Sequence, residues 1–280
     1  AIQHALTLVE EGADILDIGG ESTRPGATPV PLDEELKRVI PVIQGLRDVG
    51  VPLSIDTYKP EVMRAAIEAG ADIVNDVCAL QEPNALEIVA PSQVGICLMH
   101  MQGRPQTMQA DPHYDNVVQE VAEFLASRLK AAEQAGIDRS RIVLDPGFGF
   151  GKRTAHNLTL LNEMQAIQAL GQPLLVGLSR KSVLGQVLGS NVDERLHASI
   201  AASLLTGSGP VKAQSVGQQI GKALRLRAGL VRASLVEQAR HRLEGAQQRP
   251  GPVGQRHRAV GALELVAQQP QVDVVERKRQ

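Results

Sequence analysis

Aromatic residues, cysteine and long apolar runs are all scarce in this sequence. Its 280 residues include no Trp, two Tyr and three Phe. No apolar run approaches the roughly 20 residues of a membrane-spanning helix, so we expect no membrane span. The first residues lack the basic start and apolar stretch of a signal peptide and begin inside a helical pattern, so we expect the native start to lie upstream. Both cysteines, Cys78 and Cys97, lie in apolar runs, which favours buried thiols in a reducing, cytoplasmic compartment over a disulfide or a metal pair.

The most informative stretch runs from Asp145 to Lys152. An apolar strand is expected to end at Asp145-Pro146, because proline cannot donate to a sheet ladder. Three glycines then alternate with Phe148 and Phe150, and such loop aromatics indicate a platform for a flat ligand rather than core filling. With the charge of Lys152, the stretch predicts a site for a planar, polar, partly anionic molecule. A structural turn is the alternative, and the spacing excludes a Walker phosphate loop.

Strand-like and helix-like segments alternate along the first 205 residues. Helical spacing of apolar residues predicts helices at residues 2–11, 31–48, 60–69, 83–90, 116–135, 157–170 and 193–205. Short apolar runs predict six strands at residues 14–19, 51–57, 72–77, 95–101, 141–145 and 173–179. Such alternation implies a parallel sheet that is buried on both faces.

Polar residues at nearly every predicted strand end decide between two parallel architectures. In an open doubly wound sheet only the strands at the switch point need them, whereas all strand ends of a (β/α)₈ barrel converge on one mouth. We therefore predict an α/β fold of the TIM-barrel type over residues 1–206, incomplete at about six βα units. The residues concerned are Asp17, Asp56, Asn75, Asp76, His100, Asp145 and the run from Ser179 to Lys181.

The composition changes at about Thr206. Residues 207–280 contain 13 Lys and Arg, 5 Asp and Glu, and eleven Gln, with no aromatic residue, so they are basic while the rest of the chain is acidic. Residues 211–243 could form a basic amphipathic helix interrupted by glycines, and residues 247–258 resemble a disordered segment. A nucleic-acid or membrane-binding arm is one interpretation, but no aromatic is present to stack on a base. We favour a tail from a shifted reading frame or a fusion joint, with no nucleic-acid or membrane partner.

Six motifs occur in order at compatible spacing: Glu21-Ser-Thr-Arg-Pro-Gly-Ala, Ser54-Ile-Asp-Thr, Asn75-Asp, Leu98-Met-His-Met-Gln-Gly, Leu144-Asp-Pro-Gly-Phe-Gly-Phe-Gly-Lys and Gly177-Leu-Ser-Arg-Lys-Ser. Over roughly residues 1 to 205 the chain thereby resembles the dihydropteroate synthase family. The resemblance implies a barrel that joins 6-hydroxymethyl-7,8-dihydropterin diphosphate to p-aminobenzoate in folate synthesis and releases diphosphate. It also implies a requirement for Mg²⁺, inhibition by sulfonamides and a homodimer built on late helices of the barrel.

The resemblance assigns roles to individual residues. Asp56, Asn75 and Asp145 would bind the hydrogen-bonding edge of the pterin, and Lys181 would lie against the pterin near p-aminobenzoate. Arg24, in a loop that could close over an anion, would bind the diphosphate and is, with Lys181, a candidate catalytic residue. The remaining candidates for substrate contacts are Thr23, Pro25, Met99, Phe150, Gly151, Gly177, Ser179 and Ser182.

Ordinary structural roles stay open for several of these residues. Asn75 or Asp56 could cap a helix or form a turn, Arg24 could be solvated, and Lys181 could be an exposed residue at a helix start. The implied reaction needs no side-chain nucleophile, because the C–O bond to diphosphate breaks first and the neutral arylamine captures the resulting cation. We expect His100 to line the pocket rather than act as a base.

Two parts of the family pattern are absent from the sequence. The first strand, whose Asn binds Mg²⁺ in the family, would precede residue 1, and the last strand, whose Arg and His bind diphosphate, would follow Leu205. We therefore assign no metal ligand in this chain. Strands 14–19 and 173–179 are expected to expose unpaired edges, and residues 1–280 to have little or no activity. An inactive fragment and a pterin-binding methyltransferase acting on methyltetrahydrofolate remain the alternatives.

Overall fold

The computed structural model describes residues 1–179, 181–189, 191–195, 198–199, 202, 206 and 271–276, the last segment by its backbone. Five parallel strands form the centre of the fold. They are β1 (Ala13–Gly19), β2 (Leu53–Asp56), β3 (Ile73–Asp76), β4 (Gly95–Met99) and β5 (Ile142–Asp145). Each strand pairs with the next in the chain, and a sixth strand, β6 (Gln271–Glu276), completes the order β5-β4-β3-β2-β1-β6.

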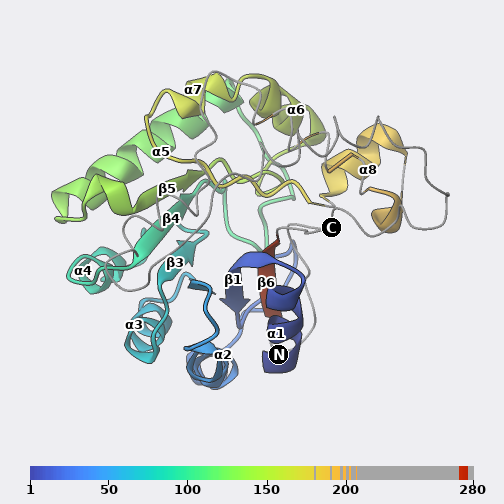
Figure 1. Ribbon diagram of the computed structural model, residues 1–280. Helices are drawn as coiled ribbons and strands as arrows, with labels where there is room; N and C mark the ends of the chain where they lie inside the picture. The colour runs from blue at the N-terminus through green and yellow to red at the C-terminus, as the bar shows by residue number, and fades with distance from the viewer. Residues whose placement is uncertain are drawn as a thin grey trace, which may run out of the picture.

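Most of the helices lie on the outer side of this curved sheet, and those that connect the strands follow its arc (Figure 1). Among the described residues, no helix is both long enough and apolar enough to cross a bilayer. The α-helices are α1 (Ile2–Glu10), α2 (Leu32–Leu46), α3 (Pro60–Ala69), α4 (Ala85–Val89), α5 (Val117–Gln134), α6 (Thr154–Asn162), α7 (Gln165–Gln168) and α8 (Ser182–Leu188). Two 3₁₀ turns, η1 (Arg139–Arg141) and η2 (Val192–Glu194), complete the set.

Local sequence explains where individual helices begin and end. Helix α3 begins with a proline in its first turn and ends at Gly70, whose left-handed backbone, with φ of 114°, lets its N–H bond to the carbonyl of Ala66. Helix α5 begins after Asn116, whose side chain accepts a hydrogen bond from the Gln119 N–H at 3.1 Å.

The strand register separates an apolar outer face from a polar inner face. Leu16, Leu53, Val74, Ile96 and Leu144 alternate with the inner positions and belong to the main core beneath the helices. On the inner face, a small cluster of Ile15, Ile73 and Val143 fills the lower part. The positions above this cluster, toward the carboxyl ends of the strands, carry most of the polar residues singled out from the sequence.

The segment at residues 173–179 forms less sheet than its sequence predicts. It runs parallel to β5 with a single bridge between Leu144 and Leu174. The Leu144 N–H donates to the carbonyl of Pro173 at 3.0 Å, and the Leu175 N–H to the carbonyl of Leu144 at 2.9 Å. The predicted helix at 157–170 is divided into α6 and α7. Most of the predicted helix at 193–205 lies outside the described residues, as do the predicted basic helix at 211–243 and the segment at 247–258.

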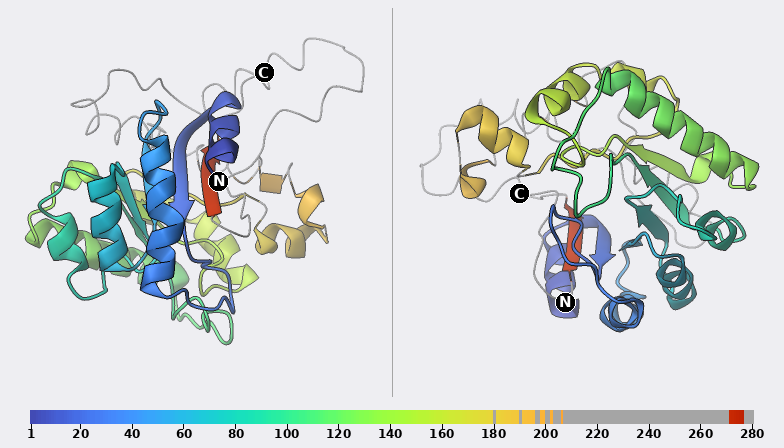
Figure 2. Two further views of the ribbon diagram at one scale, coloured as in Figure 1. Left: turned by 90° about the horizontal axis from the view of Figure 1, so that it is seen from below. Right: turned by 180° about the vertical axis from the view of Figure 1, so that it is seen from behind.

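The expectation that β1 has an unpaired edge is wrong. Strand β6 pairs antiparallel with β1, so that Asp17 lies opposite Asp273 and Ile15 opposite Val275. Figure 2 shows β6 beside β1 in both views. An exposed strand edge presents free N–H and C=O groups, which an extended segment rich in β-branched residues can pair with. Residues 271–276 of the tail thus form a strand, outside the two tail segments for which the sequence predicted a helix or disorder.

Replacing Val275 by proline should open this edge. The Leu16 N–H faces β2, since it donates to the carbonyl of Pro52, so the N–H groups of Ile15 and Asp17 face β6. Proline at position 275 removes a ladder donor. Hydrogen exchange at the Ile15 and Asp17 amides should then accelerate by about fivefold to tenfold. The control Val275→Thr keeps the N–H and the branched shape, and equal exchange in both variants would contradict the pairing.

Candidate active site

Three polar side chains meet on the inner face where β1, β2 and β3 end. The register places Gly19 beside Asp56 and Asp56 beside Asn75. The Asn75 amide donates to Asp17 Oδ2 at 2.9 Å, reaching across the intervening strand. A Cβ built on Gly19 would lie 3.6 Å from Asp56 Oδ2, so the absence of a side chain there leaves room beside the carboxylate. The structure thus brings Asp56 and Asn75 together, and it adds Asp17 to them.

Asp145 enters the same face from β5. It lies opposite Met99 of β4, and Cys97 of β4 lies opposite Asn75 of β3, so the polar positions continue across the sheet. Cys97 lies in the middle of this row of inner-face positions, between Asn75 of β3 and Val143 of β5. Burial raises the pKa of its thiol well above the ordinary value, and the charges of Asp145, Asp17 and Asp56 raise it further. The thiol is therefore held in the neutral form, which excludes it as a nucleophile.

The loop after β5 folds back tightly on the loop after β4. Asp145 Oδ1 accepts a hydrogen bond from the Gly147 N–H at 2.7 Å. Gly147 has a φ of 67°, and a Cβ there would lie 1.9 Å from the carbonyl oxygen of His100. At Gly151, with a φ of 60°, a Cβ would lie 2.4 Å from the carbonyl oxygen of Gln102. Only glycine permits this contact, so Gly151 shapes the loop by its backbone.

The sequence suggested that Lys152 presents its charge to a ligand, but in the structure this charge is turned inward. Its side chain is buried, and its ammonium lies 2.8 Å from His100 Nδ1, 2.9 Å from the Gly147 carbonyl and 3.1 Å from the Phe150 carbonyl. Burial lowers the pKa of Lys152 to about 7. Burial, followed by the charge of Lys152, lowers the pKa of His100 to about 3. His100 is therefore neutral, and it supports the loop instead of acting as a base.

The two loop phenylalanines have different roles. Phe148 is 1% exposed and belongs to the main core, so the expectation that both form a ligand platform is wrong for Phe148. Phe150 is partly exposed and packs against the cluster of Val77, Cys78 and Met99. The ammonium of Lys181 lies 4.7 Å from the centre of the Phe150 ring. Phe150 and Lys181 therefore form one wall of the candidate site, joined by a cation–π contact.

The neighbours Asn75 and Asp76 point to opposite faces of β3, because side chains alternate along a strand. Asp76 is fully buried on the helix side, where its carboxylate accepts the N–H groups of Cys78 and Leu80, each at 2.7 Å. Burial raises the pKa of Asp76 to about 7. It is a turn residue, and its predicted place at the mouth is wrong.

Some of the remaining candidate residues lie near the wall formed by Phe150 and Lys181, and others lie on the surface. Gly177 lies near Lys181, because a Cβ on it would be 3.8 Å from Lys181 Cε. Ser179 is buried, and its Oγ has no hydrogen-bond partner in the described part of the chain. Ser182 is exposed at the start of α8, and Arg180 lies outside the described residues. The capping role considered for Asp56 is not observed, since Lys59 is the N-cap residue of α3.

The loop that carries Thr23, Arg24 and Pro25 connects β1 to α2. Thr23 is half-buried, whereas Arg24 and Pro25 are exposed. The Gly26 N–H lies 3.4 Å from the carbonyl of Pro105, which places the loop tip beside the loop after β4.

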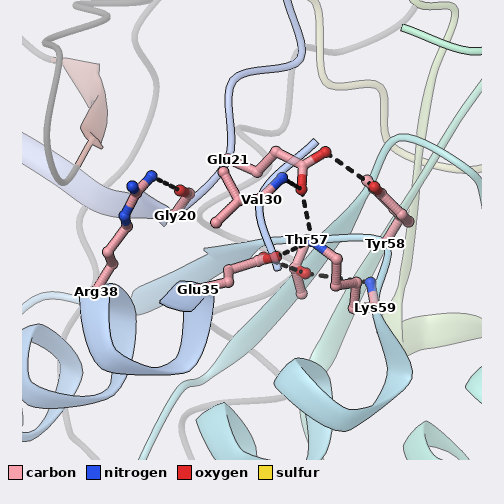
Figure 3. A network of polar contacts seen from close by, with 8 residues as sticks. All are labelled: Gly20, Glu21, Val30, Glu35, Arg38, Thr57, Tyr58 and Lys59. Carbon is pink, nitrogen blue, oxygen red and sulfur yellow. Dashed lines mark hydrogen bonds and ion pairs between the residues drawn. The ribbon is translucent and has the colours of Figure 1, made fainter. Parts of the chain in front are cut away.

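The base of this loop is held by a buried network that the sequence analysis missed. Glu21 and Glu35 both bond to Lys59, the first at 2.5 Å, and Tyr58 and Thr57 add hydrogen bonds to the two carboxylates (Figure 3). Glu35, in the first turn of α2, has no motif that would mark it as part of such a network. The sequence contained one signal for this network, because Glu21 is the first residue of the motif Glu21-Ser-Thr-Arg-Pro-Gly-Ala, in which only later residues were assigned roles.

No group of three or more His, Cys, Asp or Glu that could hold a metal ion occurs in the described part of the chain. A Mg²⁺ ion at this site would therefore need ligands beyond such a group, such as the phosphate oxygens of a substrate.

The burial of Lys152 predicts a dependence of stability on pH. Its folded pKa of about 7 lies below the ordinary value of 10.5. Between these values the unfolded chain binds a proton that the folded chain lacks, so the free energy of unfolding should rise with pH. Urea denaturation at about pH 7 and about pH 9 should show a smaller rise for Lys152→Met than for the unaltered chain. The exposed Lys130→Met is the control, and an equal rise in all three proteins would refute the assignment.

Comparison with known proteins identifies the family. A model of the family described as pterin binding enzyme matches residues 1–214. The dihydropteroate synthase of Escherichia coli K12 is 48% identical over 206 residues, covering 73% of each chain. Two solved structures are also similar. The synthase of Xanthomonas albilineans with 4-aminobenzoic acid has a TM-score of 0.71 at 46% identity, covering 89% of this chain and 85% of that one. The synthase of Burkholderia cenocepacia complexed with 7,8-dihydropteroate has a TM-score of 0.71 at 44% identity, covering 88% of each.

These similarities confirm the predicted fold, a parallel α/β architecture of the TIM-barrel type. They also favour a synthase over a methyltransferase, because these relatives and structures are synthases. The chain therefore belongs to the family of pterin-binding enzymes, as an enzyme of the dihydropteroate synthase type that serves folate synthesis.

Proposed function

We propose that the inner-face residues of this chain bind a pterin diphosphate and hold it for attack by p-aminobenzoate, giving 7,8-dihydropteroate and diphosphate. The observation that carries this proposal is the meeting of Asp17, Asp56 and Asn75 at the ends of three adjacent strands, with Asp145 on the same face. A pterin edge carries both donors and acceptors. Carboxylates accept hydrogen bonds, and an amide both donates and accepts, so this set can orient a flat ring in one way.

The wall of Phe150 and Lys181 supports the second half of the proposal. A partly exposed aromatic ring under an ammonium offers an apolar surface beside a positive charge. Such a surface suits the ring and the carboxylate of p-aminobenzoate. The buried Ser179 hydroxyl, which no described group engages, is available to the same carboxylate. Ser182, Thr23, Pro25 and Met99 stay candidates for contacts around this ring.

In the proposed reaction the C–O bond to diphosphate breaks, and the leaving group takes the electron pair. The arylamine nitrogen then forms the C–N bond and loses a proton to solvent. Arg24 stabilises the departing diphosphate, and Lys181 adds positive charge beside it. The protein's main contribution is to hold the two reactants in line in a site that excludes competing nucleophiles. No side-chain nucleophile takes part.

Mg²⁺ stays in the proposal as a partner of the diphosphate, since this ion is usually held by one or two carboxylates together with substrate phosphates. A cytoplasmic location is also proposed, and the two free, buried thiols of Cys78 and Cys97 suit a reducing compartment. We further propose a homodimer through late helices, whose residues lie mostly outside the described part of the chain.

Asp145→Asn should weaken pterin binding by about 1–3 kcal/mol, because it replaces a charge-assisted hydrogen bond by a neutral one. The asparagine keeps an oxygen that can still accept the Gly147 N–H, so the loop should be retained. Calorimetric titration with 6-hydroxymethylpterin measures the effect. Asp115→Asn is the matched control, since this carboxylate is fully exposed. Equal affinities in the two variants would remove Asp145 from the pterin site.

Product analysis tests the function itself. Incubation with the pterin diphosphate, p-aminobenzoate and Mg²⁺ should yield dihydropteroate, with diphosphate released only when the arylamine is present. The expectation that residues 1–280 have little or no activity remains a prediction; it concerns the amount of product rather than its identity, and the same assay measures it. Release of diphosphate without consumption of the arylamine, or methyl transfer from methyltetrahydrofolate, would contradict the proposed reaction.

A further inference from the structure

The loop between β1 and α2 is closed at its base by one carboxylate. Glu21 stands at the start of the loop, and its Oε2 accepts the N–H of Val30, near the end of the loop, at 2.9 Å. The loop that carries Thr23, Arg24 and Pro25 is thus a closed segment, with its two ends joined through the Glu21 side chain. Figure 3 shows Glu21 between Val30 and the residues that follow β2.

A partly buried ammonium links this carboxylate to the body of the fold. Lys59, just before α3, bonds to Glu21 at 2.5 Å and also to Glu35 of α2. The side chains of Glu21 and Glu35 are 5% and 1% exposed. Burial acts to lower the pKa of Lys59, but its hydrogen bonds to the two carboxylates outweigh this effect and raise the pKa. The lysine therefore stays charged, as two buried carboxylates require.

Two further contacts tie the same network to the candidate site. The Tyr58 hydroxyl donates to Glu21 Oε1 at 2.9 Å, and its ring packs in the cluster that includes Met99 and Phe150. The Thr57 hydroxyl donates to Glu35 at 2.7 Å, and Thr57 directly follows Asp56. At Gly20 a Cβ would lie 2.7 Å from the Glu35 side chain, so the start of the loop is pressed against α2. The loop base and the pterin-facing strand end thus share one set of contacts.

We propose that Glu21, Lys59, Glu35 and Tyr58, here called the loop clasp, are positioning residues that set where the Thr23–Arg24–Pro25 loop stands over the site. This inference rests on the proposed function, in which the loop binds the arylamine and the diphosphate. The clasp acts through the loop, so its loss should weaken those two ligands. The pterin edge, held by strand-end residues, should bind unchanged. A merely structural role would weaken all ligands together.

Hydrogen exchange tests the clasp without any substrate. Lys59→Met removes the ammonium and leaves two buried carboxylates facing each other, and Glu21→Gln removes one charge while keeping an acceptor. Amides of residues 22–29, except Pro25 and Pro29, which carry no N–H, should exchange about tenfold faster in both variants. Lys59→Arg, which retains the charge, should restore most of the protection. Lys37→Met, an exposed lysine on α2, is the matched control. Unchanged exchange at residues 22–29 in Lys59→Met and Glu21→Gln would overturn the clasp.

Ligand binding then tests the functional role of the loop clasp. The variants used are Glu21→Gln and Tyr58→Phe, which change the size of the side chain least. Affinity for p-aminobenzoate in the presence of inorganic diphosphate should fall about tenfold in Glu21→Gln and less in Tyr58→Phe. Affinity for 6-hydroxymethylpterin alone should stay within about twofold. Equal losses for both ligands, or a faster-exchanging loop with unchanged p-aminobenzoate affinity, would overturn the positioning role. If the unaltered chain binds neither ligand, the proposed function fails, while the exchange experiment still decides whether the clasp holds the loop.

Discussion

The parallel pairing of β1 to β5 is the constraint on which the rest of this structure depends. In a parallel sheet, paired residues of neighbouring strands share a face, and all carboxyl ends lie at one edge. The register from Gly19 through Asp56 and Asn75 to Cys97 therefore places a polar set on one face, above an apolar cluster. A shift by one residue in any strand would exchange its polar inner side chains for the apolar outer ones beneath the helices.

Two lysines, the buried Lys152 and the partly buried Lys59, organise the loops that rise from this edge. Lys152 joins carbonyl oxygens of the loops after β4 and β5, and Lys59 joins carboxylates from the loop after β1 and from α2. A buried ammonium is costly unless its hydrogen bonds are satisfied, and each of these has several acceptors. Both charges thus serve to hold backbone that carries candidate ligand contacts. In the candidate site it is the ammonium of Lys181 that lies over the ring of Phe150.

Within the described part of the tail, β6 pairs with β1 on the edge that the sequence analysis predicted to be unpaired. The pairing is antiparallel, unlike that of β1 to β5. This pairing uses backbone N–H and C=O groups, which do not depend on the type of side chain except that proline lacks the N–H. It therefore does not require the βα pattern to continue into the tail. Composition, which describes side chains, could not reveal such a contact.

By itself, the sequence determined the parallel α/β class, the order of most elements and the strand ends where Asp56, Asn75 and Asp145 stand. It did so because apolar periodicity, proline and glycine act locally, and because the motifs are contiguous. Only the tertiary structure decided that Phe148 and Lys152 are buried, that Asp76 turns away from Asn75, and that Lys59 joins Glu21 to Glu35. Each of these depends on what packs against a side chain from a distant part of the chain, and no local pattern contains that information.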